Sequence, residues 1–285
     1  MRRKTSSAAP SMRDALYEAP GPKTQRKILV GTVISGVAVA ALLAFVVMRF
    51  YVTGQLDARY WYFFAQPTTW AYLLRGFAGT ARVALTAGAI SLILGLLLML
   101  GRTSHLRVLS AVCRVVIDFF RGVPSLLLIY FFFLVVPQYG ISMPAFWMLA
   151  LPVALAASGV LAEVLRAGVN AVPKGQVEAA LSLGLSPMKT TFKIVLPQAI
   201  RFVIPSLISQ LVVVVKDTTV AYVVSYPDLM QNARVLISNY DSLVSVYFVI
   251  AVVYILINFA INQASVAVAR RSGAKVVDRL AQNPS

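Results

Sequence analysis

The sequence predicts an all-α membrane protein with six transmembrane helices. Of the 285 residues, 59% are hydrophobic and only 13% are charged, whereas about a quarter of the residues of a soluble domain carry a charge. The mean hydropathy of +0.78 agrees with a fold whose solvent is lipid. The apolar residues also form uncharged runs that approach or exceed the roughly 20 residues needed to cross a bilayer as a helix.

The chain begins with a polar and basic segment, residues 1–27, in which Lys and Arg are mixed with Ser, Pro and Gly. Little apolar surface is available there to offset the entropy lost on ordering, so we expect a disordered tail. The apolar run at 28–50 is longer than the hydrophobic part of a typical signal peptide. We therefore expect it to remain in the protein as a first transmembrane helix.

Further apolar runs predict five more crossings, with helices near 83–100, 115–136, 144–166, 202–215 and 242–269. The first of these extends backwards past Arg82, and the fourth continues past Lys216. The second and third share one long run, which we divide at residues 137–144 because Pro and Gly cluster in turns. The aromatic segment at 51–75 suits the membrane interface.

The distribution of positive charge predicts the orientation of these helices. If the N-terminus is cytoplasmic, the inside segments are 1–27, 101–114, 166–201 and 270–285. They carry 7, 3, 5 and 4 of the 26 Lys and Arg residues, which is 19, against 6 in the outside segments. Such a bias marks the cytoplasmic side, so both termini are predicted to be cytoplasmic in a multi-pass protein of the plasma membrane. Basic residues placed between apolar runs also argue against nucleic acid as a partner, despite the net charge of +16.

The residues that enzymes and metal sites need are scarce. Cys113 is the only cysteine and His105 the only histidine, which is too few for an internal disulfide or a metal-ligand set. We therefore predict no metal site, no catalytic residue and no enzyme activity. The sequence also lacks the Gly-x-x-x-x-Gly-Lys-Ser/Thr phosphate loop, so we expect no cofactor in this chain, and ATP would have to act on a partner.

The predicted cytoplasmic loop at 166–201 has a local structure that its residue types indicate. Residues 176–183 favour a short helix, which Gly184 ends. Ser186 as N-cap and Pro187 in the first helical position then start a second helical piece. Pro197 is expected to end that piece before the next crossing.

The residues of this loop resemble the EAA motif of the permease subunits of ABC importers. The matching positions are Glu178, Ala179, Ala180, Gly184, Ile194, Leu196 and Pro197, and the extension that includes Gly175 resembles the polar amino acid branch, the glutamate, glutamine and histidine type. The resemblance covers about residues 76–270, which would form the five-helix transmembrane domain of such a permease. Residues 28–50 would then be an additional helix, and 271–285 a cytoplasmic tail.

The resemblance implies how the protein is driven. In that family the loop docks into a cleft on an ATPase subunit, so the matching residues are expected to couple the membrane domain to ATP hydrolysis. The implied partners are a pair of ATPase subunits that bind ATP and Mg²⁺, a second permease subunit, and an extracellular or periplasmic amino-acid-binding protein, besides membrane lipid. The second permease subunit is either a copy or a homologue. The implied function is import of a polar amino acid.

Ionisable residues at membrane depth cost about 2.5–3.5 kcal/mol each, so they are candidates for function. Asp118 and Arg121 can pair at a spacing of three, as can Glu163 and Arg166. The segment from Asp118 to Pro124 resembles the acidic-x-x-Arg-Gly-x-Pro segment of the family, and Lys216-Asp217-Thr218-Thr219 resembles its Lys-Asp-Thr-Ser segment. Val123, Ser125 and Leu128 depart from the residues that are frequent in the family. The candidate substrate pocket is formed by Asp118, Arg121, Lys216, Asp217 and Thr218.

Two interpretations of these charges stay open. In the first, Arg121 binds the α-carboxylate of an amino acid through two hydrogen bonds, Lys216 adds a point charge, and Asp118 or Asp217 accepts hydrogen bonds from the ammonium group. A surplus of positive charge would then favour an acidic substrate, glutamate or aspartate. In the second, the charged residues form structural ion pairs. Two rival functions also remain: an ion-gradient-driven secondary amino acid transporter, and a membrane scaffold or insertion factor.

Overall fold

The computed structural model describes residues 21–271, so most of the predicted basic tail at 1–27 and nearly all of the tail at 271–285 lie outside the described residues. The described part is helical throughout and contains no β-strand, which confirms the all-α prediction. Five helices are long and apolar enough to cross a membrane, and a sixth crossing results if the bent pair 107–122 and 125–139 counts as one. The described structure thus has five or six crossings, and the predicted six corresponds to the count that includes the bent pair.

Residues up to Asp57 form a compact unit of their own, and the remaining residues form a second. The described element of the first unit is α2 (Pro22–Val52). It starts six residues before the predicted helix at 28–50, and none of its most apolar stretch is buried. A helix that is apolar all round and finds no cover in its own unit is suited to lipid.

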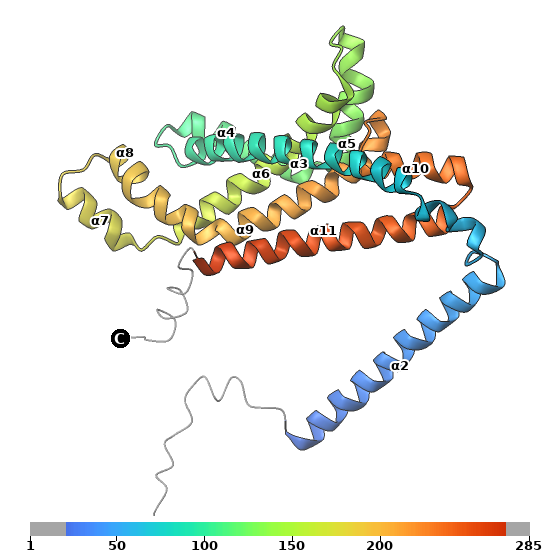
Figure 1. The fold of residues 1–285 in the computed structure, drawn as a ribbon. Helices are drawn as coiled ribbons and strands as arrows, with labels where there is room; N and C mark the ends of the chain where they lie inside the picture. The colour runs from blue at the N-terminus through green and yellow to red at the C-terminus, as the bar shows by residue number, and fades with distance from the viewer. Residues whose placement is uncertain (1–20, 272–285) are drawn as a thin grey trace, which may run out of the picture. The chain divides into compact units, whose positions relative to one another are not determined.

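The core of the second unit consists of α3 (Pro67–Arg102), α6 (Ala145–Asn170), α9 (Leu196–Asp217) and α11 (Leu243–Arg271), which run alongside one another in Figure 1. Buried aliphatic side chains such as Val83, Val153 and Val214 form its main cluster. Small residues permit close packing: a Cβ on Gly95 of α3 would lie 2.9 Å from the Cβ of Leu161 of α6.

Shorter elements connect these helices. They are η1 (Ala58–Tyr60), η2 (Tyr62–Ala65), α4 (Arg107–Gly122), α5 (Ser125–Tyr130), η3 (Phe131–Val135), η4 (Val136–Tyr139), α7 (Lys174–Ser182), α8 (Pro187–Thr190), η5 (Thr191–Val195), η6 (Thr218–Val224) and α10 (Leu229–Tyr240). The helix predicted near 83–100 is part of α3, which begins well before residue 76, at Pro67. The helices predicted at 144–166 and 242–269 are confirmed as α6 and α11.

The prediction of one helix near 115–136 is wrong. The helical path breaks between α4 and α5, where the chain bends by 97°. Val123 has extended backbone angles, φ −88° and ψ 124°, because the ring of Pro124 disfavours a helical conformation for the residue before it. The break places Arg121 at the end of one helix and Ser125 at the start of the next.

Pro197 does not end the loop helix, which is a second correction. It lies in the first turn of α9, and the helical path from 187 to 224 is continuous. The π-helical turn η5, at Thr191–Val195, immediately precedes it. We attribute the continuity to this wider turn, which accommodates a proline that lacks an N–H and carries a bulky ring.

Helix α10 is not among the predicted elements, although its residues carry a signal for it. The side chain of Asp228 accepts a hydrogen bond from the N–H of Gln231 at 2.7 Å, which caps the helix. Leu229, Ala233 and Leu236 are buried at helical spacing. In the aromatic segment before α3, the ring of Phe63 stacks on Tyr240 of α10, with centroids 4.3 Å apart.

Candidate functional site

The first candidate site is the helical hairpin of α7, α8 and η5, residues 174–195, which we call the coupling segment. Figure 1 shows it at one end of the second unit, beyond the ends of α6 and α9. Gly184 has a φ of +78°, and its N–H donates to the carbonyl oxygen of Leu181 at 2.9 Å, while the N–H of Leu185 donates to Ala180 at 3.1 Å. These two bonds form the glycine-dependent helix end known as a Schellman motif.

The second piece of the segment starts as predicted. The hydroxyl oxygen of Ser186 accepts a hydrogen bond from the N–H of Lys189 at 3.5 Å, and Pro187 occupies the first helical position. The prediction of a helix ended by Gly184 and restarted at Ser186 is therefore confirmed.

The coupling segment presents small and apolar residues on its surface. Of the residues predicted to couple, those exposed are Gly175, Glu178, Ala179, Gly184 and Pro197, whereas Ile194 is half-buried and Ala180 and Leu196 are buried. Leu183 is 81% exposed and Met188 72% exposed. Large apolar side chains at the tip of a helical hairpin are suited to contact with another protein.

The base of the coupling segment is tied to α6 and α9. A Cβ on Gly168 of α6 would lie 2.8 Å from the carbonyl oxygen of Ala199 of α9, so only glycine allows the two backbones to approach this closely. Val172 and Val195 pack with Ala199 in a small buried cluster at this crossing. The base of the hairpin is therefore packed tightly against two of the helices that are long enough to cross a membrane.

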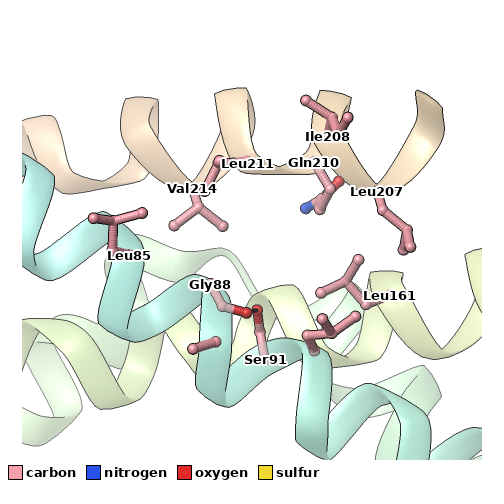
Figure 2. Close-up of a pocket in the computed structure, with 11 residues that line it drawn as sticks. Leu85, Gly88, Ser91, Leu161, Leu207, Ile208, Gln210, Leu211 and Val214 are labelled. Carbon is pink, nitrogen blue, oxygen red and sulfur yellow. Dashed lines mark hydrogen bonds between the residues drawn. The ribbon is translucent and has the colours of Figure 1, made fainter. Parts of the chain in front are cut away.

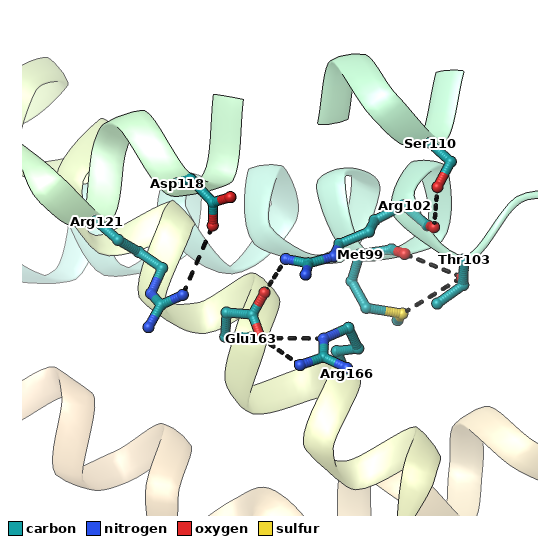
Figure 3. Close-up of polar contacts among 8 residues, drawn as sticks. All are labelled: Met99, Arg102, Thr103, Ser110, Asp118, Arg121, Glu163 and Arg166. Atoms are coloured by element: carbon teal, nitrogen blue, oxygen red, sulfur yellow. Dashed lines mark hydrogen bonds and ion pairs between the residues drawn. The ribbon is translucent and has the colours of Figure 1, made fainter. Parts of the chain in front are cut away.

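A group of ion pairs lies near the same end of the core (Figure 3). Glu163 of α6 accepts a hydrogen bond from Arg102 at the end of α3. Its other carboxylate oxygen accepts two from Arg166, at 3.0 and 2.8 Å. The hydroxyl of Ser110 in α4 donates to the carbonyl oxygen of Arg102 at 2.7 Å. Arg102 thereby connects α3 to α6 through Glu163 and to α4 through Ser110, and the predicted pairing of Glu163 with Arg166 is confirmed.

The predicted pair of Asp118 and Arg121 is present but loose, with a nitrogen-to-oxygen distance of 3.8 Å and side chains that are 57% and 46% exposed, respectively. Arg121 crosses Gly159 of α6, where an added Cβ would lie 3.1 Å from its Cγ. The guanidinium also lies near enough to Glu163 to act on its charge. Arg121 is therefore at the edge of the ion-pair group, with its head group accessible.

The other predicted pocket residues, Lys216, Asp217 and Thr218, lie where α9 ends and η6 begins. Lys216 is exposed, and within residues 21–271 no carboxylate pairs with it. Asp217 is half-buried near the side chain of Ser125. Thr218 is fully buried and its hydroxyl donates to the carbonyl oxygen of Val215 at 2.8 Å. This hydrogen bond within the helix gives Thr218 a structural role. Asp217 therefore lies beside Ser125, the first residue of α5 after the break, whereas Arg121, near the end of α4 before it, lies beside Asp118.

A cavity of about 270 Å³ lies between α3, α6 and α9 (Figure 2). Its lining is mostly aliphatic, with Ser91 and Gln210 as the polar side chains, and the Ser91 hydroxyl donates to the carbonyl oxygen of Gly88. The Gln210 amide points from α9 toward α3 in Figure 2. None of the five predicted pocket residues lines this cavity. The predicted residues and the cavity are therefore separate features of the described structure.

Asp228 is a buried carboxylate that the sequence interpretation missed. It is completely buried, and its Oδ2 has no hydrogen-bond partner among the described residues. Burial raises the pKa of its carboxyl to about 6, although the N–H of Gln231 opposes this by donating to it. The hydroxyl oxygen of Thr80 accepts from the N–H of Leu229 at 3.1 Å, and Asn232 donates to the carbonyl oxygen of Tyr72 at 2.8 Å. These contacts hold α10 against α3.

Sequence reasoning placed Arg102 in a loop and assigned Asp228 no role. Nothing in the sequence indicates that Arg102 pairs with a residue 61 positions away. For Asp228 a signal existed, because an aspartate followed by apolar residues at helical spacing marks a helix start.

Comparisons with known proteins agree with this geometry. Residues 90–273 match the family described as binding-protein-dependent transport system inner membrane component. The chain is 35% identical to the glutamate transport system permease protein GluD of Corynebacterium glutamicum over 240 residues, which is 81% of this chain and 88% of the relative. It is also 35% identical to the probable glutamine ABC transporter permease protein GlnP of Bacillus subtilis, over 70% of this chain and 92% of the relative.

Solved structures show the same fold. A crystal structure of an amino acid ABC transporter with histidines superposes with a TM-score of 0.69 at 27% identity, covering 73% of this chain and 98% of that one. An inward-facing structure of the MetNI methionine ABC transporter has a TM-score of 0.62 at 18% identity, covering 73% and 99%. The latter supports the fold alone.

Proposed function

The chain belongs to the family of binding-protein-dependent transport system inner membrane components, and from this premise we propose that it carries an acidic amino acid, glutamate foremost, into the cell. It is the multi-pass permease subunit of an ABC importer of amino acids. The observation that carries the choice of substrate is its 35% identity to a glutamate permease over most of both chains. Family membership favours the ATP-driven importer over the ion-gradient-driven transporter and over the scaffold.

The charges near the break between α4 and α5 support an acidic substrate. Three guanidinium groups, those of Arg102, Arg121 and Arg166, accompany two carboxylates, those of Asp118 and Glu163, in this part of the core. An acidic amino acid carries one more carboxylate than ammonium groups, so a surplus cation matches it. In the proposal Arg121 and Lys216 bind carboxylates, while Asp118 or Asp217 accepts from the ammonium group. Thr218 is buried and its hydroxyl donates to the carbonyl oxygen of Val215, so it stabilises the end of α9 beside Asp217.

In the proposal, the coupling segment transmits the energy of ATP hydrolysis from the ATPase to the membrane helices. ABC importers of this family work with an ATPase and a substrate-binding protein, and we assign the exposed residues of the segment to the ATPase contact. ATP and Mg²⁺ are bound by that partner, and a second permease subunit completes the membrane part. This arrangement requires the coupling segment, and with it both termini, to be cytoplasmic.

Uptake measurements test the proposal directly. Cells that express the complete transporter, and lack other uptake routes, would be given labelled glutamate with a panel of unlabelled amino acids. Glutamate and aspartate are expected to compete, and depletion of ATP is expected to stop uptake. Competition by arginine or histidine but not by glutamate overturns the acidic substrate, and uptake that persists without ATP but stops with an ionophore overturns the ATP-driven mechanism.

A further inference from the structure

Two adjoining grooves lie at the turn that connects α3 to α4. The first, of about 390 Å³, is polar and is lined by Ser104, His105, Arg107, Ser110 and Arg114 among others. The second, of about 640 Å³, runs between that turn and α8 and is lined mainly by apolar side chains, which include Leu97, Leu100, Leu109, Met188 and Phe192. Ser104 and His105 line both grooves. The two therefore form one depression that is basic at one end and apolar at the other.

The positive charge of the polar groove is not neutralised by the described residues. Arg107 and Arg114 are seven residues apart, which places them on one side of α4 about 10 Å from each other along its axis. Both are exposed. The sequence contains no Asp or Glu between residues 101 and 117, and in the described part of the chain neither arginine takes part in an ion pair. The positive end of the α4 helix dipole, at Arg107, adds to this field.

Exposed apolar side chains continue from the grooves along α4. Val108 is 79% exposed, Val112 54% and Val115 68%. Such a surface is suited to contact with acyl chains. Unpaired arginines beside an apolar groove complement a molecule that has an anionic head and a hydrocarbon tail.

We propose that this depression binds an anionic phospholipid. The phosphate lies between Arg107 and Arg114, near Ser104 and His105, and one acyl chain occupies the apolar groove against α8. A free phosphate ion would use only the polar half, and the apolar half therefore favours the lipid. Because Met188 and Phe192 belong to the coupling segment, the bound lipid also contacts the part of the chain that we assign to the ATPase.

Binding measurements on the purified full-length protein in detergent test this proposal. The protein is titrated with short-chain phosphatidylglycerol, short-chain phosphatidylcholine and inorganic phosphate, and bound ligand is counted by native mass spectrometry. Phosphatidylglycerol is expected to bind more tightly than phosphatidylcholine, and its affinity is expected to fall as NaCl is added, because the attraction is partly ionic. This measurement needs no variant.

A double variant locates the site. Arg107→Gln with Arg114→Gln is expected to raise the Kd for phosphatidylglycerol by roughly tenfold to thirtyfold. The matched control is Arg75→Gln with Arg82→Gln, since these two exposed arginines have the same spacing on α3. The control is expected to bind phosphatidylglycerol like the unmodified protein.

Three results overturn the proposal. One is equal affinity of both double variants for phosphatidylglycerol together with no salt dependence. The second is displacement of phosphatidylglycerol by an equal concentration of inorganic phosphate, which assigns the site to a free anion. The third is unchanged lipid affinity combined with loss of the ATPase subunit from the Arg107/Arg114 variant, which assigns the surface to a protein.

Discussion

Arg102 at the end of α3 and Glu163 in α6 form an ion pair although they are 61 positions apart in the chain. Both side chains are largely buried, with 16% and 17% exposed. Glu163 also binds Arg166, two turns or less from the end of α6 that leads to the coupling segment. This carboxylate therefore holds the end of α6 in place, and α6 leads directly into the coupling segment.

Replacement of Glu163 by Gln is expected to destabilise the protein. It leaves the largely buried guanidinium of Arg102 and the half-buried guanidinium of Arg166 without a carboxylate, which costs about 2–4 kcal/mol. Thermal unfolding in detergent measures the effect. The matched control is Asp118→Asn, which removes a carboxylate from the exposed pair with Arg121 and is expected to cost little. Equal losses of stability in the two variants would show that Glu163 has no special structural role.

Substitution of Gly184 by Asp is expected to uncouple the transporter without preventing membrane insertion. Gly184 has a φ of +78° and open space around its Cα, so the change strains the backbone by roughly 1–2 kcal/mol and adds charge to the proposed ATPase contact. The readout is substrate-stimulated ATP hydrolysis by the assembled complex. Gly140→Asp is the control, since Gly140 has a φ of +77° and equally open surroundings. Full stimulation in the Gly184 variant would exclude the docking role.

Removal of Arg121 or Lys216 tests the substrate pocket. If each side chain binds a substrate carboxylate, then Arg121→Ala and Lys216→Ala each raise the substrate concentration for half-maximal uptake by about tenfold to a hundredfold. Initial rates of labelled glutamate uptake measure this. Arg75→Ala, which removes an exposed arginine from α3, is the control. Unchanged uptake kinetics in both variants would return Arg121 and Lys216 to a structural role.

The buried carboxyl of Asp228 predicts a dependence of stability on pH. Its pKa is raised to about 6 in the folded protein, against about 3.9 in an unfolded chain. The folded state thus binds the proton more tightly, and the stability that this contributes is present below about pH 4 and is lost as the pH rises through 6. At pH 7.5 the buried charge therefore costs up to about 3 kcal/mol.

Asp228→Asn is the variant that tests this, because Asn keeps the oxygen that caps α10 and carries no charge. It is expected to unfold at a higher temperature than the unmodified protein at pH 7.5, with a difference that shrinks toward pH 5. Asp241→Asn serves as a control, since Asp241 follows the same helix and is exposed. A difference between Asp228→Asn and the unmodified protein that stays constant from pH 5 to 7.5 would contradict the assignment.

The sequence determined the features that depend on neighbouring residues and on solvent. The number of crossings follows from run length, since each buried backbone group in lipid must find its partner within its own helix. The end of α7 at Gly184 and the start of α8 at Ser186 follow from local hydrogen bonding. The pattern around Glu178 and Gly184 was also sufficient to identify the family.

The features that depend on contacts between distant segments were decided only by the tertiary structure. The sequence contained Pro124, but the bend of 97° that follows from it depends on how α4 and α5 pack against α6. It contained Pro197, but whether the helix stops there depends on the π-helical turn that precedes it. The pairing of Arg102 with Glu163 and the burial of Asp228 against α3 arise from contacts between segments far apart in the chain. Such contacts have no signature in a single sequence, because their energy depends on which helices become neighbours.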